Sequence, residues 1–218
     1  MRKRYLSYFL AIIIMTLFAI PVMASNEALS IKADVAQKML MDGNKRFITE
    51  QYAKVNIGQA RRAELAKGQF PFAVVICCSD SRVPPELLFN QGLGDIFVVR
   101  VAGNVLGSME LGSVEYAVEH LGVKLIVVLG HEQCGAVKAA VDGGKFSPNI
   151  MEITKKIQPA VESAKAVHAT DMYEAAADNN VKNMVAMLNA SRVVTHVEGV
   201  SVLGAKYHLK SGEVEFFK

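Results

Sequence analysis

The sequence predicts an α/β fold in which a mostly parallel central sheet is flanked by helices. Three short runs, residues 72–77, 96–101 and 125–129, are apolar at nearly every position. Such runs are typical of strands that are buried on both faces of a parallel sheet. Helical periodicity over residues 107–121 separates the second run from the third. Strands that alternate with helices favour right-handed crossovers within one sheet.

The other elements follow from periodicity and turn residues. Apolar positions recur at helical spacing over residues 31–47, which predicts an amphipathic N-terminal helix. Ser211 and Gly212 predict a turn between the last two strands, the second of which we expect at an edge of the sheet, where pairing with a second subunit is possible. The remaining expected elements are helices at residues 59–67, 135–141 and most of 148–191, and strands at residues 200–209 and 214–217.

Residues 1–24 have the pattern of a secretory signal peptide. A basic start is followed by an apolar run, and Val22 and Ala24 suit a cleavage site. The remaining residues, 25–218, form a single domain, because about 190 residues fit one domain with its own core. The pattern predicts an exported, periplasmic protein. An uncleaved membrane anchor is the alternative, because the apolar run approaches the roughly 17–25 residues that span a bilayer.

The charge balance argues against a nucleic-acid partner. The leader contains three of the 24 Lys and Arg residues and no acidic residue, so the mature chain carries 21 charges of each sign. Nucleic-acid binding requires a basic patch or stripe, and the sequence has no dense run of Lys and Arg. We expect no nucleic-acid partner and, once the leader is cleaved, no membrane partner.

Cys78, His131 and Cys134 predict one zinc site. Cys78 and His131 come at the ends of two predicted strands, and ligand sites form at the carboxyl ends of such strands. Cys134 lies at the start of a short helix, where the exposed N–H groups favour a thiolate. Three protein ligands leave the fourth position of a tetrahedral zinc open to water, as in catalytic sites. Three cysteines cannot form a four-cysteine structural cluster, but another histidine or a carboxylate as fourth ligand stays open.

A disulfide is the competing interpretation of the cysteines, because disulfides persist in exported proteins. Neighbouring side chains on a strand point to opposite faces, so Cys77 and Cys78 are not expected to bridge each other or to share a partner. A disulfide between Cys78 and Cys134 is less favoured than zinc. Cys77 is expected to be a small, buried, apolar residue.

These motifs resemble those of the β-class carbonic anhydrases, and the resemblance covers nearly the whole mature chain. It implies a catalytic domain of that family at residues 25–218, with an N-terminal helical arm. Val101 stands where the family often has asparagine. The matching motifs are Cys78-x-Asp80-x-Arg82, His131-x-x-Cys134 within residues 130–137, and Arg100-Val101-Ala102-Gly103-Asn104.

The resemblance implies an enzyme that interconverts carbon dioxide with bicarbonate and a proton. One Zn²⁺ per chain would carry a hydroxide that attacks carbon dioxide. Zinc lowers the pKa of bound water from near 15.7 to about 7 in favourable sites. Two thiolates neutralise the ion more than three imidazoles do, so we expect a higher pKa for the bound water than in a three-histidine site. Activity should therefore rise with pH. The resemblance also implies a homodimer or a larger homo-oligomer.

Asp80 and Arg82 are expected to orient the nucleophile. Alternation along an extended segment places both side chains on the face of Cys78. A charge-assisted pair would keep the Asp80 carboxylate off the metal, where it accepts the hydroxide proton in a hydrogen bond. A structural salt bridge is the alternative. A second alternative is a closed site in which Asp80 binds the metal. The resemblance implies that some family members have such a pH-dependent form.

Gln69 and Gly135 are expected to bind the substrate. Gln69 lies nine residues before Cys78, at the position of a substrate-binding glutamine in one subgroup of the family. Its amide N–H, and the backbone N–H of Gly135 at the helix start, would polarise a substrate oxygen without binding the metal.

Three other functions remain open. The same scaffold could hydrolyse carbonyl sulfide or carbon disulfide. A cysteine-nucleophile enzyme, with His131 activating Cys134 or Cys78, would be active without metal. A non-catalytic zinc-binding or redox protein is the third, and Asp80 and Arg82 argue against it because zinc storage needs neither residue.

Overall fold

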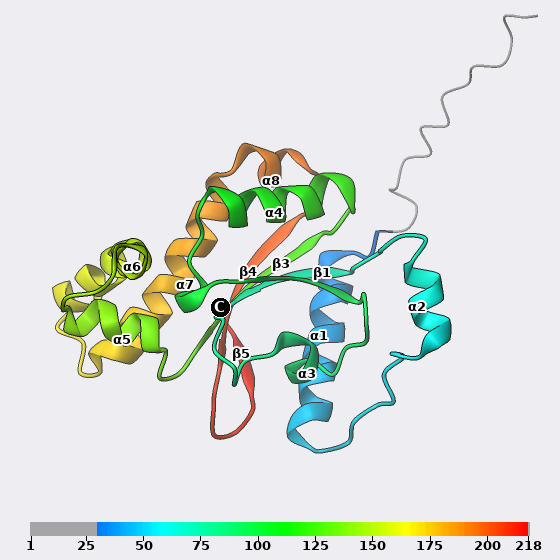
Figure 1. Cartoon of the computed structure of the whole chain (residues 1–218), viewed down its shortest axis with the longest axis horizontal. Coiled ribbons are helices and arrows are strands. Elements are labelled where there is room, and N and C mark those ends of the chain that lie inside the picture. Colours follow the sequence, from blue (N-terminus) through cyan, green and yellow to red (C-terminus); the bar gives the residue numbers. More distant parts are fainter. Residues whose placement is uncertain (1–29, 218) are drawn as a thin grey trace, which may run out of the picture.

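The structure, a computed structural model, describes residues 30–217, and the predicted signal peptide lies outside the described residues. Figure 1 shows a central sheet with helices on both sides, as the sequence predicts. The strand order is β2-β1-β3-β4-β5, and the first four strands are parallel. The strands are β1 (Ala73–Cys77), β2 (Ile96–Arg100), β3 (Leu125–His131), β4 (Ser201–Tyr207) and β5 (Val214–Phe216).

Two of the three apolar runs, those of β1 and β3, are buried as expected, whereas β2 lies at an edge of the sheet and is only partly buried. All residues of β1 and β3 are buried, because each strand has a neighbour on both sides and helices over both faces. β5 pairs only with β4, in antiparallel orientation, so the expectation of an edge position for the last strand is confirmed.

The helices also agree with the sequence prediction, with three short exceptions. Two single-turn helices, α3 (Pro85–Leu88) and α8 (Arg192–His196), and the 3₁₀ turn η2 (Ala102–Asn104) were not expected. Within residues 30–217 there is no helix with the length and apolar character required for crossing a membrane. The helices are α1 (Ala33–Ile48), α2 (Gln59–Leu65), α3 (Pro85–Leu88), α4 (Ser108–His120), α5 (Gly135–Asp142), α6 (Pro148–Ala166), α7 (Met172–Ala190) and α8 (Arg192–His196).

Alternation along β1 divides the core into two layers. Val75 and Cys77 pack on the side of the sheet that α1 covers, with Leu40 of that helix. Val74 and Ile76 pack on the opposite side, against α4 and α7. Figure 1 shows α1 and α4 on opposite sides of the sheet. The two adjacent cysteines at the end of β1 therefore have different surroundings.

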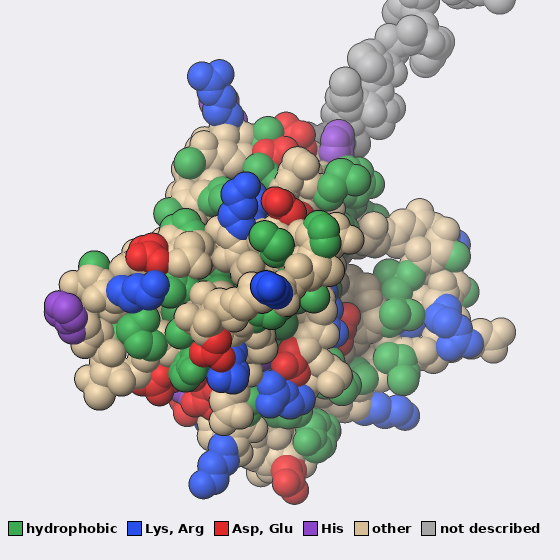
Figure 2. Space-filling model, turned by 60° about the vertical axis from the view of Figure 1, so that its left-hand side comes forward, with side chains coloured by type: hydrophobic (Ala, Val, Ile, Leu, Met, Phe, Trp, Pro, Cys, Tyr) green, Lys and Arg blue, Asp and Glu red, His purple; other side chains and the backbone are tan. Residues whose placement is uncertain are grey.

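A third apolar cluster surrounds the carboxyl ends of β1 and β3. It contains Cys78 and Cys134 together with residues of α5, α6 and α7, among them Val137 and Ile157. On the surface that Figure 2 shows, basic and acidic side chains are interspersed, and neither sign of charge is concentrated in one patch. The fold thus places two of the predicted metal ligands in a buried, largely apolar environment.

Candidate metal centre

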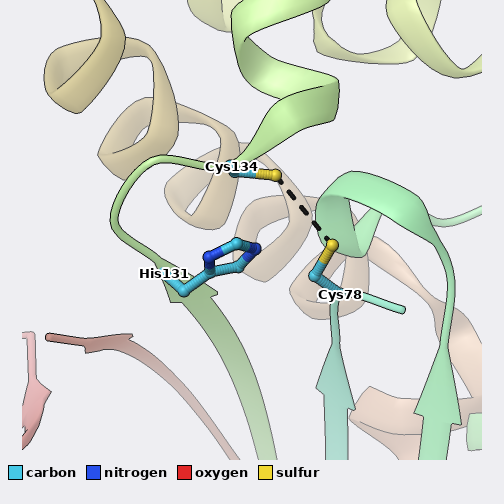
Figure 3. A group of neighbouring side chains, drawn as sticks. All are labelled: Cys78, His131 and Cys134. Atoms are coloured by element: carbon cyan, nitrogen blue, oxygen red, sulfur yellow. Dashed lines mark hydrogen bonds between the residues drawn. The ribbon is translucent and has the colours of Figure 1, made fainter. Parts of the chain in front are cut away.

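Three predicted ligands meet at the carboxyl edge of the sheet. Cys78 follows β1, His131 ends β3, and Cys134 directly precedes α5. Because β1 and β3 are parallel neighbours, their carboxyl ends lie side by side. Figure 3 shows the three side chains pointing toward one another. The two sulfur atoms are 4.0 Å apart, and one ligand atom from each residue lies within 4.8 Å of the others.

The spacing of these atoms fits zinc. Zn–S bonds of about 2.3 Å in a tetrahedral shell separate two sulfurs by about 3.8 Å. The observed distance between Cys78 Sγ and Cys134 Sγ is 4.0 Å. Cys78, His131 and Cys134 are all buried, and the three cysteines of the chain are free thiols. The donor set is therefore that of a three-ligand zinc site, in agreement with the preference for zinc over a disulfide.

The imidazole of His131 is oriented for metal binding. His131 Nδ1 lies 2.8 Å from the Glu132 carbonyl oxygen. A carbonyl oxygen only accepts, so Nδ1 carries the proton and Nε2 keeps its lone pair. His131 Nε2 is buried and has no hydrogen-bond partner among the described residues. Buried polar atoms are normally satisfied, and a metal ion would satisfy this one.

The two thiols share one proton when no metal is bound. The hydrogen bond from the Cys134 thiol, together with those from the backbone, lowers the pKa of Cys78 to about 4. The backbone donors are the N–H groups of Gly103, at 3.2 Å, and Asp80, at 3.4 Å. Hydrogen bonding to the Cys78 thiolate raises the pKa of Cys134. Because zinc binds both sulfurs as thiolates, metal binding releases this proton and becomes stronger as the pH rises.

Cys77 has no part in this cluster. Its side chain is buried on the α1 side of the sheet. Burial raises the pKa of Cys77 to about 12. The thiol is thus protonated at neutral pH and behaves as the small apolar residue that the sequence predicts.

Asp80 and Arg82 form a bidentate ion pair beside the cluster. Asp80 Oδ1 accepts from Arg82 Nε at 2.9 Å, and Oδ2 accepts from Arg82 Nη2 at 2.8 Å. These hydrogen bonds lower the pKa of Asp80 to about 2, so the carboxylate is ionised at neutral pH. Arg82 Nη2 also lies 3.4 Å from the Gln133 carbonyl oxygen, in the loop between the other two ligands. In this arrangement Arg82 occupies both oxygens of Asp80, and the group of potential metal ligands does not include that carboxylate.

Arg100 was named in a sequence motif but was given no role there. Its Nε donates to the Cys78 carbonyl oxygen at 3.1 Å, and its Nη2 donates to the Asp80 carbonyl oxygen at 2.7 Å. Arg100 ends β2 and pairs with Cys77 in the register of the sheet. One guanidinium therefore anchors the backbone on both sides of Ser79, the residue between the metal ligand Cys78 and Asp80. The feature of the sequence that indicates this role is the position of Arg100 at the end of the apolar run that becomes β2, the neighbour of β1.

The two predicted substrate-binding residues lie in different places. Gly135 is the first residue of α5, next to Cys134, and the space where a Cβ atom would project is open. Gln69 is exposed and precedes the amino end of β1. Five residues of extended chain span about 17 Å, so Gln69 lies across the sheet from the metal cluster of its own chain. The structure does not bring Gln69 together with the other site residues.

A second charged cluster connects the metal-ligand loop to the last two strands. Glu132 Oε1 lies 2.8 Å from His208 Nδ1, and Glu132 Oε2 accepts from the Leu209 N–H at 2.9 Å. His208 Nε2 is 3.3 Å from Glu215. The hydrogen bond to Glu132 raises the pKa of His208, and the same bond lowers the pKa of Glu132. The sequence offered no sign of this cluster, because His208 has no ligand spacing.

Replacing His208 with glutamine is expected to reduce stability in a pH-dependent manner. The raised pKa of His208 stabilises the fold fully below about pH 6.5, and this contribution is lost as the pH rises through the folded-state pKa. The lowered pKa of Glu132 adds stability above about pH 4.5. The free energy of unfolding, measured in urea titrations, should therefore fall by about 1 kcal/mol at pH 6 and by less at pH 9.

His196→Gln is the control for this prediction, since exposed His196 forms a hydrogen bond only within its own helix. Equal losses at both pH values would contradict the ion pair.

The chain matches a known protein family and is similar to several known proteins. Residues 73–214 match the protein family described as carbonic anhydrase. The chain is similar to a carbonic anhydrase of Mycolicibacterium smegmatis, with 44% identity over 191 residues that cover 83% of this chain and 91% of that protein.

Solved structures show the same likeness. A β-carbonic anhydrase of Aspergillus fumigatus has 32% sequence identity and a TM-score of 0.66, over 72% of this chain and 80% of that one. A chain from the tetrameric β-carbonic anhydrases of Sordaria macrospora has a TM-score of 0.68 over 84% of this chain and 94% of that one. Its identity is 24%, so this second match shows a similarity of fold.

Proposed function

The chain belongs to the β-class carbonic anhydrases, which hydrate carbon dioxide reversibly, and from this premise we propose that it works with one zinc ion bound by Cys78, His131 and Cys134. The observation that carries the proposal is the buried Nε2 of His131, which has no partner among the described residues, in a cluster whose three ligand atoms lie within 4.8 Å of one another. The family membership does not favour hydrolysis of carbonyl sulfide or carbon disulfide.

The residues around the cluster define the proposed mechanism. When bound by Cys78, His131 and Cys134, zinc would supply Lewis acidity, which makes a nucleophile available from water near neutral pH. Asp80, ionised and fixed by Arg82, accepts a hydrogen bond from the attacking oxygen and so directs its lone pair toward carbon dioxide. The N–H of Gly135, at the start of α5, donates to a substrate oxygen as negative charge develops there.

Metal removal tests this proposal directly. Carbon dioxide hydration is measured by stopped flow from about pH 6.5 to about pH 9, on protein as purified, after chelation and after zinc is restored. Activity should follow zinc content up to about one ion per chain. It should also rise with pH, because two thiolates reduce the acidity of the metal.

Two outcomes would contradict the zinc mechanism. Protein with a full complement of zinc but no hydration activity at any of these pH values would exclude it. Full activity of metal-free protein would instead favour a cysteine nucleophile.

We further propose that Gln69 binds substrate in the site of a second subunit. Gln69 precedes the amino end of β1, and Cys78 follows the other end of this strand, which is about 17 Å long, so Gln69 does not reach the metal cluster of its own chain. A homodimer or larger homo-oligomer that places Gln69 of one chain near Asp80 of another would allow this contact. Gln69 is exposed, which leaves its side chain accessible to a second chain.

Mixing two inactive variants is expected to restore activity. Gln69→Ala and Asp80→Asn should each lower kcat/KM by about 100-fold or more. When the two variants are co-expressed with different affinity tags, one of the two sites in each mixed dimer contains both native residues. Random pairing should then give about a quarter of wild-type activity.

The control for this experiment is the pair Gln59→Ala and Asp80→Asn. Gln59 is exposed at the start of α2, and its loss should leave activity unchanged. Absence of recovery in purified mixed dimers of Gln69→Ala and Asp80→Asn would show that Gln69 does not act across subunits.

Export is a further part of the proposal. Its support is the signal-peptide pattern of residues 1–24. N-terminal sequencing of protein from the periplasmic fraction should begin at Ser25, whereas an intact Met1 in the membrane fraction would indicate an uncleaved anchor.

A further inference from the structure

The peptide groups around Gly103 lie against the metal centre in an unusual backbone turn. Gly103 N–H donates to Cys78 Sγ at 3.2 Å. Two successive residues of η2 have positive φ, Gly103 at 72° and Asn104 at 45°. The left-handed region is unfavourable for residues that carry a Cβ atom, so neighbouring groups must hold this turn in place. A Cβ atom on Gly103 would approach Ile157 Cδ1 to 2.8 Å, which shows how closely α6 packs on the turn.

Asn180 holds the turn from a helix that is distant in sequence. Its side chain on α7 is 1% exposed, and its Nδ2 donates to the Gly103 carbonyl oxygen at 2.8 Å. The N–H and the carbonyl of Gly103 belong to the two peptide planes that flank its Cα. One plane is held by Cys78 and the other by Asn180, so rotation about the two dihedral angles of Gly103 is restricted from both sides.

The chemistry of Asn180 suggests that this hydrogen bond is its specific contribution. The Oδ1 atom of Asn180 is buried and has no hydrogen-bond partner among residues 30–217. A buried, unpaired amide oxygen is unfavourable, and leucine would fill a similar volume without that cost. What leucine would lack is the donor to Gly103.

We infer that Asn180 is a positioning residue of the metal centre, which holds the Gly103 peptide so that its N–H donates to the Cys78 thiolate. The inference rests on the zinc site proposed above. A hydrogen bond to a thiolate withdraws negative charge from the sulfur and fixes its direction. Such outer contacts orient metal ligands and tune the metal. Loss of the Asn180 donor should therefore weaken metal binding and change the thiolate–metal bond.

Zinc affinity and the spectrum of the cobalt-substituted protein test this role. In Asn180→Leu, the zinc dissociation constant, measured by competition with a chromophoric chelator, should rise about 10- to 100-fold. With Co²⁺ in place of zinc, the thiolate-to-cobalt charge-transfer band should shift in Asn180→Leu. Asn179→Leu is the matched control on the same helix, because Asn179 Nδ2 donates to the Ala160 carbonyl oxygen of α6 at 3.4 Å and not to Gly103. The zinc dissociation constant and the cobalt charge-transfer band of Asn179→Leu should equal those of the wild type.

Wild-type zinc affinity together with an unshifted cobalt band in folded Asn180→Leu would overturn the inference. If leucine prevents folding, Asn180→Ser provides a smaller side chain whose hydroxyl does not reach Gly103, and the same two measurements decide. A wild-type chain that binds zinc but does not hydrate carbon dioxide would count against the proposed function alone. A wild-type chain that binds neither zinc nor cobalt would overturn both.

Discussion

Replacing Cys78 with alanine is expected to remove zinc from the protein and to lower carbon dioxide hydration by more than about 1,000-fold. Cys78 supplies one of three ligand atoms, and the other two, from His131 and Cys134, would leave a shell half filled by solvent. Zinc content is measured by atomic absorption after dialysis, and hydration by stopped flow.

The adjacent cysteine provides a matched control. Cys77 is buried on the opposite face of the sheet, against α1, and it is not in the ligand cluster. Cys77→Ala should retain about one zinc per chain and wild-type activity, with a loss of roughly 1 kcal/mol in unfolding free energy from the small cavity. A Cys78→Ala protein that keeps both zinc and activity would refute the assignment of the ligands.

Replacing Asp80 with asparagine is expected to lower kcat/KM by about 100- to 10,000-fold while zinc stays bound. The substitution keeps the size of the side chain but removes its charge and one acceptor oxygen. An amide would place an NH₂ group toward the Arg82 donors or toward the attacking oxygen, and either arrangement removes a hydrogen bond that the carboxylate makes. Activity and zinc content are measured on the same preparation.

Asp142→Asn is the corresponding control. Asp142 lies near the end of α5 and is paired with Lys138 at 2.8 Å, so it is also a carboxylate in an ion pair on an element of the site. Its loss should change kcat/KM by less than about 2-fold, because exposed pairs contribute little. Unchanged activity in Asp80→Asn would mean that Asp80 and Arg82 form a structural salt bridge only.

Much of the fold could be predicted from the sequence because its signals are local. The runs that become β1 and β3 are apolar throughout, since both faces of these strands are buried. The short elements α3, η2 and α8 escaped prediction because three to five residues carry too little periodicity. The turn η2 depends on positive φ at Asn104, a conformation that packing imposes and that the residue type alone does not indicate.

The sequence by itself determined the identity of the candidate ligands and the edge of the sheet where they lie. The residue types Cys, His and Cys, at the ends of strands that can be recognised from their composition, were sufficient for that. Only the tertiary structure decided which nitrogen of His131 is left without a hydrogen-bond partner, how Arg100 and Asn180 support Cys78, and that Gln69 lies across the sheet. These features depend on strand register and on contacts between residues far apart in the chain, such as Gly103 and Asn180, which are 77 positions apart. Local composition contains no information about such distances, because packing of the whole domain sets them.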